Sequence, residues 1–270
     1  MRRGLAGIAA FGALLALGAS AMAGPAAAPA SSDWTVTLGV EGRVLPTYEG
    51  SGTSMLRPFP MFDVRRVGTP AGFRSPRDGA SFGIFDYGRF VAGPTAKVRF
   101  ARHEDDDSDL RRLGDVAWTL EAGAFAEYWP SDWLRGRVEL RQGIGGHHGL
   151  VSDVTADVVV PVTRQLTFSG GPRMTLATTA ATSPYFSITP GQSAASGLPV
   201  YDAGGGFRSF GAGVQARYEW SPQWATHMFV EYERLAGDAA NSPLVVRFGK
   251  RDQIQVGMGV TYSFDMKGLW

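Results

Sequence analysis

Two stretches of the chain carry side chains that could take part in acid–base or metal chemistry. His147 and His148 stand together among glycines, and residues 104–109 form an acidic run, Glu-Asp-Asp-Asp-Ser-Asp. Imidazoles and carboxylates can activate water or hold a divalent cation when secondary structure fixes their spacing. Neither stretch has such a spacing, so the sequence predicts solvated polar loops there. We therefore expect no catalytic residue, no metal site and no cofactor, and the protein is predicted not to be an enzyme.

The elements that position the other charged residues are clearest near the end of the chain. From Gln253 to Phe264 the even positions are apolar and the odd positions are polar or glycine. A period of two indicates a β-strand with one apolar and one polar face. The length of this stretch fits the ~9–11 tilted residues with which a strand of a closed barrel crosses a bilayer. It is therefore predicted to be a transmembrane β-strand.

Similar stretches recur along the chain and are separated alternately by short and long connections. The short connections are residues 130–132, 162–164 and 221–223, and the long ones are residues 102–114, 179–206 and 236–252. Outer-membrane barrels have short periplasmic turns and long outer loops, and their strand number is even. Residues 72–85 are predicted to form two short strands around a turn at 76–79, which gives twelve strands, with ten as the alternative. The predicted fold is all-β, a transmembrane antiparallel up-and-down β-barrel.

The same alternation places many charged side chains on the inner face of the barrel. The charged residues that we expect to form a network in the lumen include Glu121, Glu127, Arg135, Arg137, Glu139, Arg141, Arg217, Glu231 and Glu233. Open ion channels usually show a bias toward one sign or rings of one charge. Because positive and negative charges are nearly equal here, the sequence predicts side chains that pair across the lumen and close it.

The hairpin within residues 116–141 allows a prediction of strand register. Inward positions must face inward positions, so the numbers of paired residues must sum to an even value. A sum of 262 sets Glu127 opposite Arg135 and Glu121 opposite Arg141, whereas a sum of 260 sets Glu121 opposite Glu139. Opposite charges across two strands contribute ~0.2–1 kcal/mol, and like charges are unfavourable. The sequence therefore predicts the register with the sum of 262.

The first residues indicate export from the cytoplasm. Arg2 and Arg3 precede an apolar run, and Ala21-Met22-Ala23 has the form of a cleavage site, so residues 1–23 are predicted to be a signal peptide. Residues 24–32 are rich in Pro, Ala and Ser and are expected to be a flexible leader, followed by the barrel domain at 33–270. Removing two arginines from 26 Lys+Arg leaves 24 against 25 Asp+Glu, a net charge of −1. Such a balance does not favour a nucleic-acid partner.

Several motifs resemble those of the MipA/OmpV family of outer-membrane proteins. The resemblance includes Tyr48-Glu49-Gly50-Ser51, Ser75-Pro76-Arg77-Asp78-Gly79, Phe125-Ala126-Glu127-Tyr128-Trp129-Pro130, Ser196-Gly197-Leu198-Pro199 and Thr261-Tyr262-Ser263-Phe264. Chains of this family often stop at the position of Phe264, whereas this one continues to Trp270. Either aromatic residue could therefore be the terminal assembly signal.

The resemblance implies a location in the outer membrane and a role at the cell wall. The expected function is a scaffold that links a murein-cleaving lytic transglycosylase with a bifunctional murein synthase on the periplasmic side. Outer-membrane lipid and lipopolysaccharide are the other expected partners. The alternative function is a small-solute or osmotically regulated channel.

Overall fold

A computed structural model describes residues 33–69 and 71–268, so the predicted signal peptide, the leader up to residue 32 and Trp270 lie outside the described residues. The strands are β1 Trp34–Pro46, β2 Ser54–Arg66, β3 Ala80–Ser81, β4 Phe85–Asp86, β5 Phe90–Arg99, β6 Thr119–Ser131, β7 Leu134–Gly145, β8 Leu150–Pro161, β9 Leu166–Ala177, β10 Gly206–Glu219, β11 Trp224–Leu235 and β12 Asp252–Met266. The short helices are η1 Ser108–Leu110, α1 Thr179–Phe186, α2 Pro190–Ser196, α3 Gly237–Asn241 and α4 Pro243–Arg247. Among the described residues, no helix is long and apolar enough to cross a membrane.

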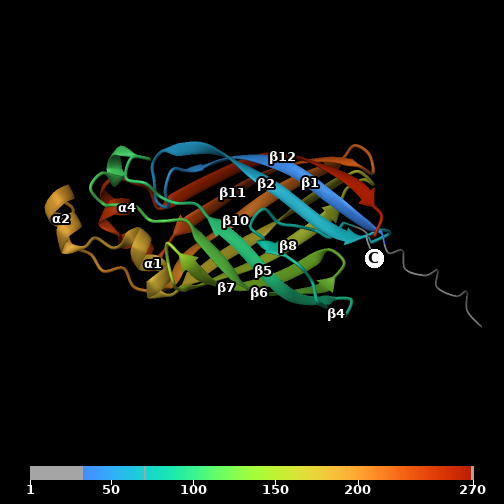
Figure 1. Cartoon of the computed structure of the whole chain (residues 1–270), viewed down its shortest axis with the longest axis horizontal. Helices are drawn as coiled ribbons and strands as arrows, with labels where there is room; N and C mark the ends of the chain where they lie inside the picture. Colours follow the sequence, from blue (N-terminus) through green and yellow to red (C-terminus); the bar gives the residue numbers. More distant parts are fainter. Residues whose placement is uncertain (1–32, 70, 269–270) are drawn as a thin grey trace, which may run out of the picture.

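The strands form a nearly closed antiparallel barrel, in agreement with the predicted fold class. One twelve-stranded sheet runs in the order β2-β1-β12-β11-β10-β9-β8-β7-β6-β5-β3, and β4 also pairs with β5. The first and last strands pair with each other, from Trp34 opposite Met266 to Val44 opposite Val256. Both termini of the barrel therefore lie at one end, and the long connections with their helices lie at the other (Figure 1). By the topology of outer-membrane barrels, the first is the periplasmic end and the second the outer end.

The alternation of side chains in β12 is the predicted one. Ile254, Val256, Met258, Val260 and Tyr262 are exposed on the outside, and the odd positions between them point inward. Apolar side chains on the outside of a barrel face lipid, because the bilayer core offers no partner to polar groups. The wall of this barrel therefore has the polarity of a membrane protein, with its charges inside.

The β6–β7 hairpin differs from the predicted register. Glu127 lies opposite Arg137 and Glu121 opposite Gly143, so the paired numbers sum to 264 and not to 262. The pairing shifts between Tyr128 and Ser131, where the extra residues of a β-bulge stand. The turn is also shorter than the predicted connection at residues 130–132, because only two residues stand between Ser131, the end of β6, and Leu134, the start of β7.

The interpretation of residues 72–85 is also corrected. The number of twelve strands is confirmed, but β3 and β4 both follow the turn at residues 76–79 and are two residues long each. They pair with different parts of β5, at Thr95–Ala96 and at Val91–Ala92. The described residues 71–79 form no strand of the wall, and Arg77 and Asp78 contact inward-facing side chains of the barrel.

Candidate functional site in the lumen

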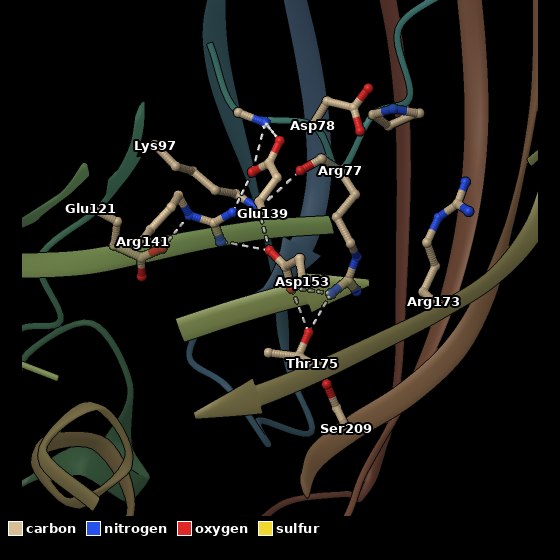
Figure 2. A network of polar contacts seen from close by, with 12 residues as sticks. Arg77, Asp78, Lys97, Glu121, Glu139, Arg141, Asp153, Arg173, Thr175 and Ser209 are labelled. Carbon is tan, nitrogen blue, oxygen red and sulfur yellow. Dashed lines mark hydrogen bonds and ion pairs between the residues drawn. The ribbon is translucent and has the colours of Figure 1, made fainter. Parts of the chain in front are cut away.

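Residues 75–79, which precede β3 and are called the inner segment here, lie in the lumen, and Arg77 contacts three strands of the wall. Its guanidinium Nη2 lies 2.5 Å from Glu231 Oε1 and 2.7 Å from Glu233 Oε2, both on β11. Nη1 donates to Thr175 Oγ1 on β9 at 2.9 Å and lies 3.5 Å from Asp153 Oδ1 on β8. Figure 2 shows the Arg77 side chain extending to Asp153 and Thr175. One residue thus joins three strands of the wall to the segment inside.

Asp78 and Gly79 attach the same segment to β7. Asp78 Oδ2 accepts from Arg135 Nη2 at 2.7 Å, and the backbone N–H of Gly79 donates to Glu139 Oε1 at 3.0 Å. A Cβ on Gly79 would lie 2.6 Å from Thr95 Oγ1 and 2.9 Å from the carbonyl oxygen of Ala96. Only glycine lets the segment approach β5 this closely. The backbone and both charged side chains of the motif therefore bind to the wall.

A ladder of ion pairs along β6, β7 and β8 carries these contacts. Arg135 Nη2 lies 2.7 Å from Glu127 Oε2, and Arg141 Nε lies 3.0 Å from Glu121 Oε2. These are the two opposite-charge contacts expected from the sequence, although the strand register differs. Arginine and glutamate side chains are long enough to meet their partners diagonally across the strands, at i and j±2 positions.

The ladder continues along β7 and into β8 without a break. Arg137 Nη2 lies 2.6 Å from Glu139 Oε1, and Arg141 Nη2 lies 2.6 Å from Asp153 Oδ2. Arg173 Nη2 lies 2.6 Å from Asp157 Oδ1 and extends the network to β9. Figure 2 shows Arg141 between Glu121 and Asp153, with Asp78 above them in the view.

Arg217 is the one member of the expected set that lies apart from this network. Among the described residues, Arg217 forms one ion pair, with Glu219 at 3.4 Å near the end of β10. The side chain of Arg217 is 32% exposed, whereas those of Arg135 and Arg141 are almost fully buried. Arg217 therefore lies near the periplasmic opening and does not contact the inner segment.

Buried ion pairs of this kind hold a segment in place more than they stabilise it. Moving two charges out of water costs several kcal/mol for each ion, and their attraction repays it only with good hydrogen-bond geometry. Removing a single partner leaves an uncompensated charge and costs about 3–5 kcal/mol. The contacts of Arg77 and Asp78 therefore fix the segment in one position in the lumen.

The motif at residues 48–51 forms the turn between β1 and β2 at the outer end. Glu49 pairs with Arg99 and, at 3.0 Å, with Arg208. Burial alone would raise the pKa of the Glu49 carboxyl, but Arg208 and Arg99 outweigh it and hold that pKa below its ordinary value. The N–H of Gly50, whose φ is +91°, donates to Gln253 Oε1 at 3.2 Å. Glu49 is therefore a charged carboxylate under the outer loops.

Comparison with known proteins gives the family. A model described as "MltA-interacting protein MipA" matches residues 38–264. The chain belongs to this family. No curated protein matches it, but solved structures of outer-membrane barrels are similar in fold. The COG4313 outer membrane channel from Pseudomonas putida F1 shares 11% identity over 88% of this chain and 97% of that one, with a TM-score of 0.45. The "NanC porin" shares 10% identity over 86% and 100%, with a TM-score of 0.40.

The surroundings of His147 in this MipA-family barrel differ from the prediction of a solvated loop. His147 is fully buried, and its Nε2 lies 3.2 Å from Glu121 Oε1, so its ring contacts one end of the ladder of ion pairs. His148 is exposed. Residues 104–109 stay partly exposed, and Asp107 Oδ2 accepts from Thr53 Oγ1 at 2.5 Å. In the part of the chain that the structure describes, no group of three or more His, Cys, Asp or Glu side chains could hold a metal ion.

Residues 79–83 read Gly-Ala-Ser-Phe-Gly, which has the spacing of the G-x-S-x-G nucleophile motif. In that motif the serine stands on a sharp turn from a strand into a helix. Here Ser81 lies in β3 and pairs with Thr95 of β5. Residues 79–83 therefore form part of the barrel wall and not a nucleophile turn.

Sequence reasoning missed the place of Arg77 and Asp78 inside the lumen. It also missed Arg102, Tyr185 and Arg208, which surround Glu49 at the outer end. One signal was available: residues 72–79 carry charges without any alternation, so they do not fit a strand of the wall.

Proposed function

We propose that this protein is a closed outer-membrane barrel that binds cell-wall enzymes and does not conduct solutes. Its partners would be a murein-cleaving lytic transglycosylase and a bifunctional murein synthase, held together at the periplasmic end. The protein would reach the outer membrane through the periplasm by means of residues 1–23 and contact lipid and lipopolysaccharide there. Its own role would be binding and not catalysis.

The observation that supports this proposal is the inner segment, residues 75–79, which ion pairs hold in one position in the lumen. Arg77 and Asp78 pair with charges on strands β7, β8 and β11. A conducting pore needs a continuous aqueous path with sites that ions enter and leave. Paired charges of both signs across the middle of the lumen do not offer such a path. This supports a scaffold over the alternative, a small-solute or osmotically regulated channel.

The name of the family supports the class of partner. The family carries the name MltA-interacting protein, and the proposal of a murein enzyme as the partner of this chain rests on membership in that family. Fold similarity to porins does not decide between the two functions, because one barrel architecture serves many roles.

The channel alternative is tested by planar-bilayer conductance of the purified barrel. We expect no stable open state in the native protein. The matched variant is Arg77→Ala, which removes the contacts of the segment with β8, β9 and β11 and should produce conducting events. A stable conductance of the native barrel equal to that of Arg77→Ala would contradict the closed scaffold.

The partner is tested by affinity capture from solubilised envelope, with an unrelated outer-membrane barrel of similar size as the control bait. We expect enrichment of a lytic transglycosylase and of a murein synthase over the control. Equal recovery of these enzymes on both baits would remove the main support for the scaffold.

A further inference from the structure

A cavity of about 250 Å³ lies in the outer half of the lumen, above the inner segment. Arg77 forms its floor, and Tyr48, Glu49 and Tyr185 line its outer part. Two hydrophobic clusters cover it from the outer side. They are built from the loops and short helices, with members that include Leu110, Leu113, Tyr185, Phe186, Ile188, Leu198, Leu244 and Val245. The loops therefore bound the cavity on its outer side, and Arg77 bounds it on its inner side.

Two buried arginines in the wall of this cavity have donors without acceptors. Arg102 and Arg208 are each 8% exposed. Within the described residues, Nε of Arg102 and both Nε and Nη1 of Arg208 have no hydrogen-bond partner. Guanidinium N–H groups are normally satisfied when buried, because an unpaired buried donor costs about 1–3 kcal/mol. Several such donors in one cavity point to a missing acceptor.

The charges around these arginines leave a positive excess. Arg99 and Arg208 share the single carboxylate of Glu49. Among the residues described, the guanidinium of Arg102 donates to the backbone oxygen of Tyr185, at 2.9 Å, and forms no ion pair. Burial, together with the neighbouring Arg99, lowers the pKa of Arg102 below its ordinary value. An anion placed among these three guanidiniums would be favoured by charge and by the fork of donors that each one offers.

The side of the cavity opens toward the membrane at a gap in the sheet. Among the described strands, β2 pairs with β1 alone. On its edge toward β2, β5 pairs with the short strands β4 and β3, and these pairings end at Ala96. Beyond that point side chains close the seam: the rings of Phe59 and Phe100 meet edge to face at 5.3 Å. Val98, on the lipid-facing side of β5 and 54% exposed, also lines the cavity. Unpaired strand edges are unfavourable at membrane depth, so this seam is the weakest part of the wall.

We propose that the cavity binds the anionic head of a single-chain amphiphile that enters from the membrane through the seam between β2 and β5. Arg102 and Arg208 bind the head, and the apolar chain leaves between Phe59 and Phe100. A carboxylate or a phosphate ester has the acceptor oxygens that the free donors lack. The cover at the outer end and the inner segment below leave the membrane as the source of the ligand.

Binding is tested with the full barrel in dodecyl maltoside by native mass spectrometry, with dodecyl phosphate as the probe. We expect a one-to-one complex that Arg102→Gln and Arg208→Gln weaken by about tenfold or more each, the loss of a charge-assisted hydrogen bond. Arg111→Gln, an exposed arginine on the same loop as Arg102, is the matched control and should bind as the native protein does.

Two further probes distinguish the contribution of the anionic head group to binding from that of the alkyl chain. Inorganic phosphate should compete poorly, and dodecyltrimethylammonium, with the same chain and a positive head, should not bind. Equal competition by inorganic phosphate would show a site for aqueous anions and overturn the amphiphile. Equal binding of the cationic probe, or unchanged binding by both Gln variants, would overturn the arginine site. Folding of each variant is checked by heat-modifiable gel mobility; Arg208→Lys, which keeps the charge and loses the fork, should bind with intermediate strength.

The route is tested by joining the two sides of the seam. The chain has no cysteine, so a Phe59→Cys, Phe100→Cys double variant can be linked by a short bismaleimide and compared with its unlinked form. We expect uptake of dodecyl phosphate to be at least about tenfold slower in the linked form. Uptake at the same rate in both forms would overturn entry through the seam.

Discussion

Arg77 and Glu231 join the inner segment of this barrel to its wall: Nη2 lies 2.5 Å from Oε1, although the two residues are 154 positions apart in the chain. The pair matters because Glu233, Asp153 and Thr175 also converge on the same guanidinium. A single arginine therefore compensates carboxylates from two strands. The position of the segment in the lumen depends on it.

Arg77→Ala should destabilise the barrel as well as open it. Three carboxylates would lose a buried partner, and breaking a buried pair costs about 3–5 kcal/mol. Urea unfolding followed by heat-modifiable gel mobility measures the free energy of unfolding. Arg234→Ala is the control, because Arg234 and Asp252 form an exposed pair, whose loss should cost less than about 1 kcal/mol. Equal losses for the two variants would contradict the role of Arg77.

Reversing the charge of Arg141 should also destabilise the barrel. Arg141→Glu would set a fourth carboxylate beside Glu121, Glu139 and Asp153, all three of which now pair with Arg141. The expected loss is about 3–5 kcal/mol, as for a broken buried pair. Adding Glu121→Arg should recover only part of it, since Glu139 and Asp153 still lose their contacts with Arg141. Unfolding of both singles and the double measures the coupling, and a double variant no better than the sum of its singles would disprove a direct contact.

Gly79→Ala should be destabilising for a steric reason. The added Cβ would lie 2.6 Å from Thr95 Oγ1 and 2.9 Å from the carbonyl oxygen of Ala96, and overpacking of this kind costs about 1–3 kcal/mol. Gly72→Ala is the matched control in the same segment, because nothing lies within 4 Å of a Cβ there. Urea unfolding should separate the two, and a Gly79→Ala barrel as stable as Gly72→Ala would show that the segment has room to move.

Deletion of residues 265–270 should be tolerated. β12 crosses the barrel from Asp252 and already reaches Phe264, which pairs with Val36 of β1. The deletion removes two pairings beyond it and the hydrogen bond of 2.6 Å from Thr35 to Asp265, a modest loss of about 0.5–3 kcal/mol. Retention of the heat-modifiable folded band is the expected result. Complete loss of that band would identify Trp270 as the assembly signal instead of Phe264.

The sequence by itself determined the strands and their two faces. The alternation from Ile254 to Tyr262 placed apolar side chains outside and polar ones inside, because successive side chains of a strand point to opposite faces wherever that strand lies. The same rule placed Glu121, Glu127, Arg135 and Arg141 in the lumen. Their contacts could be anticipated although the register was wrong, since long charged side chains reach partners two positions away.

Only the tertiary structure decided what fills the lumen. The bulge that sets Glu127 opposite Arg137 leaves no mark in the alternation, and residues 72–79 follow no period from which their path could be derived. Their place depends on Asp153, Glu231 and Glu233, which closure of the sheet brings together from distant parts of the chain. His147, in the connection between β7 and β8, is buried for the same reason, because its partner Glu121 lies on β6. Local alternation fixes the direction of a side chain, whereas its partner is fixed only when the barrel closes.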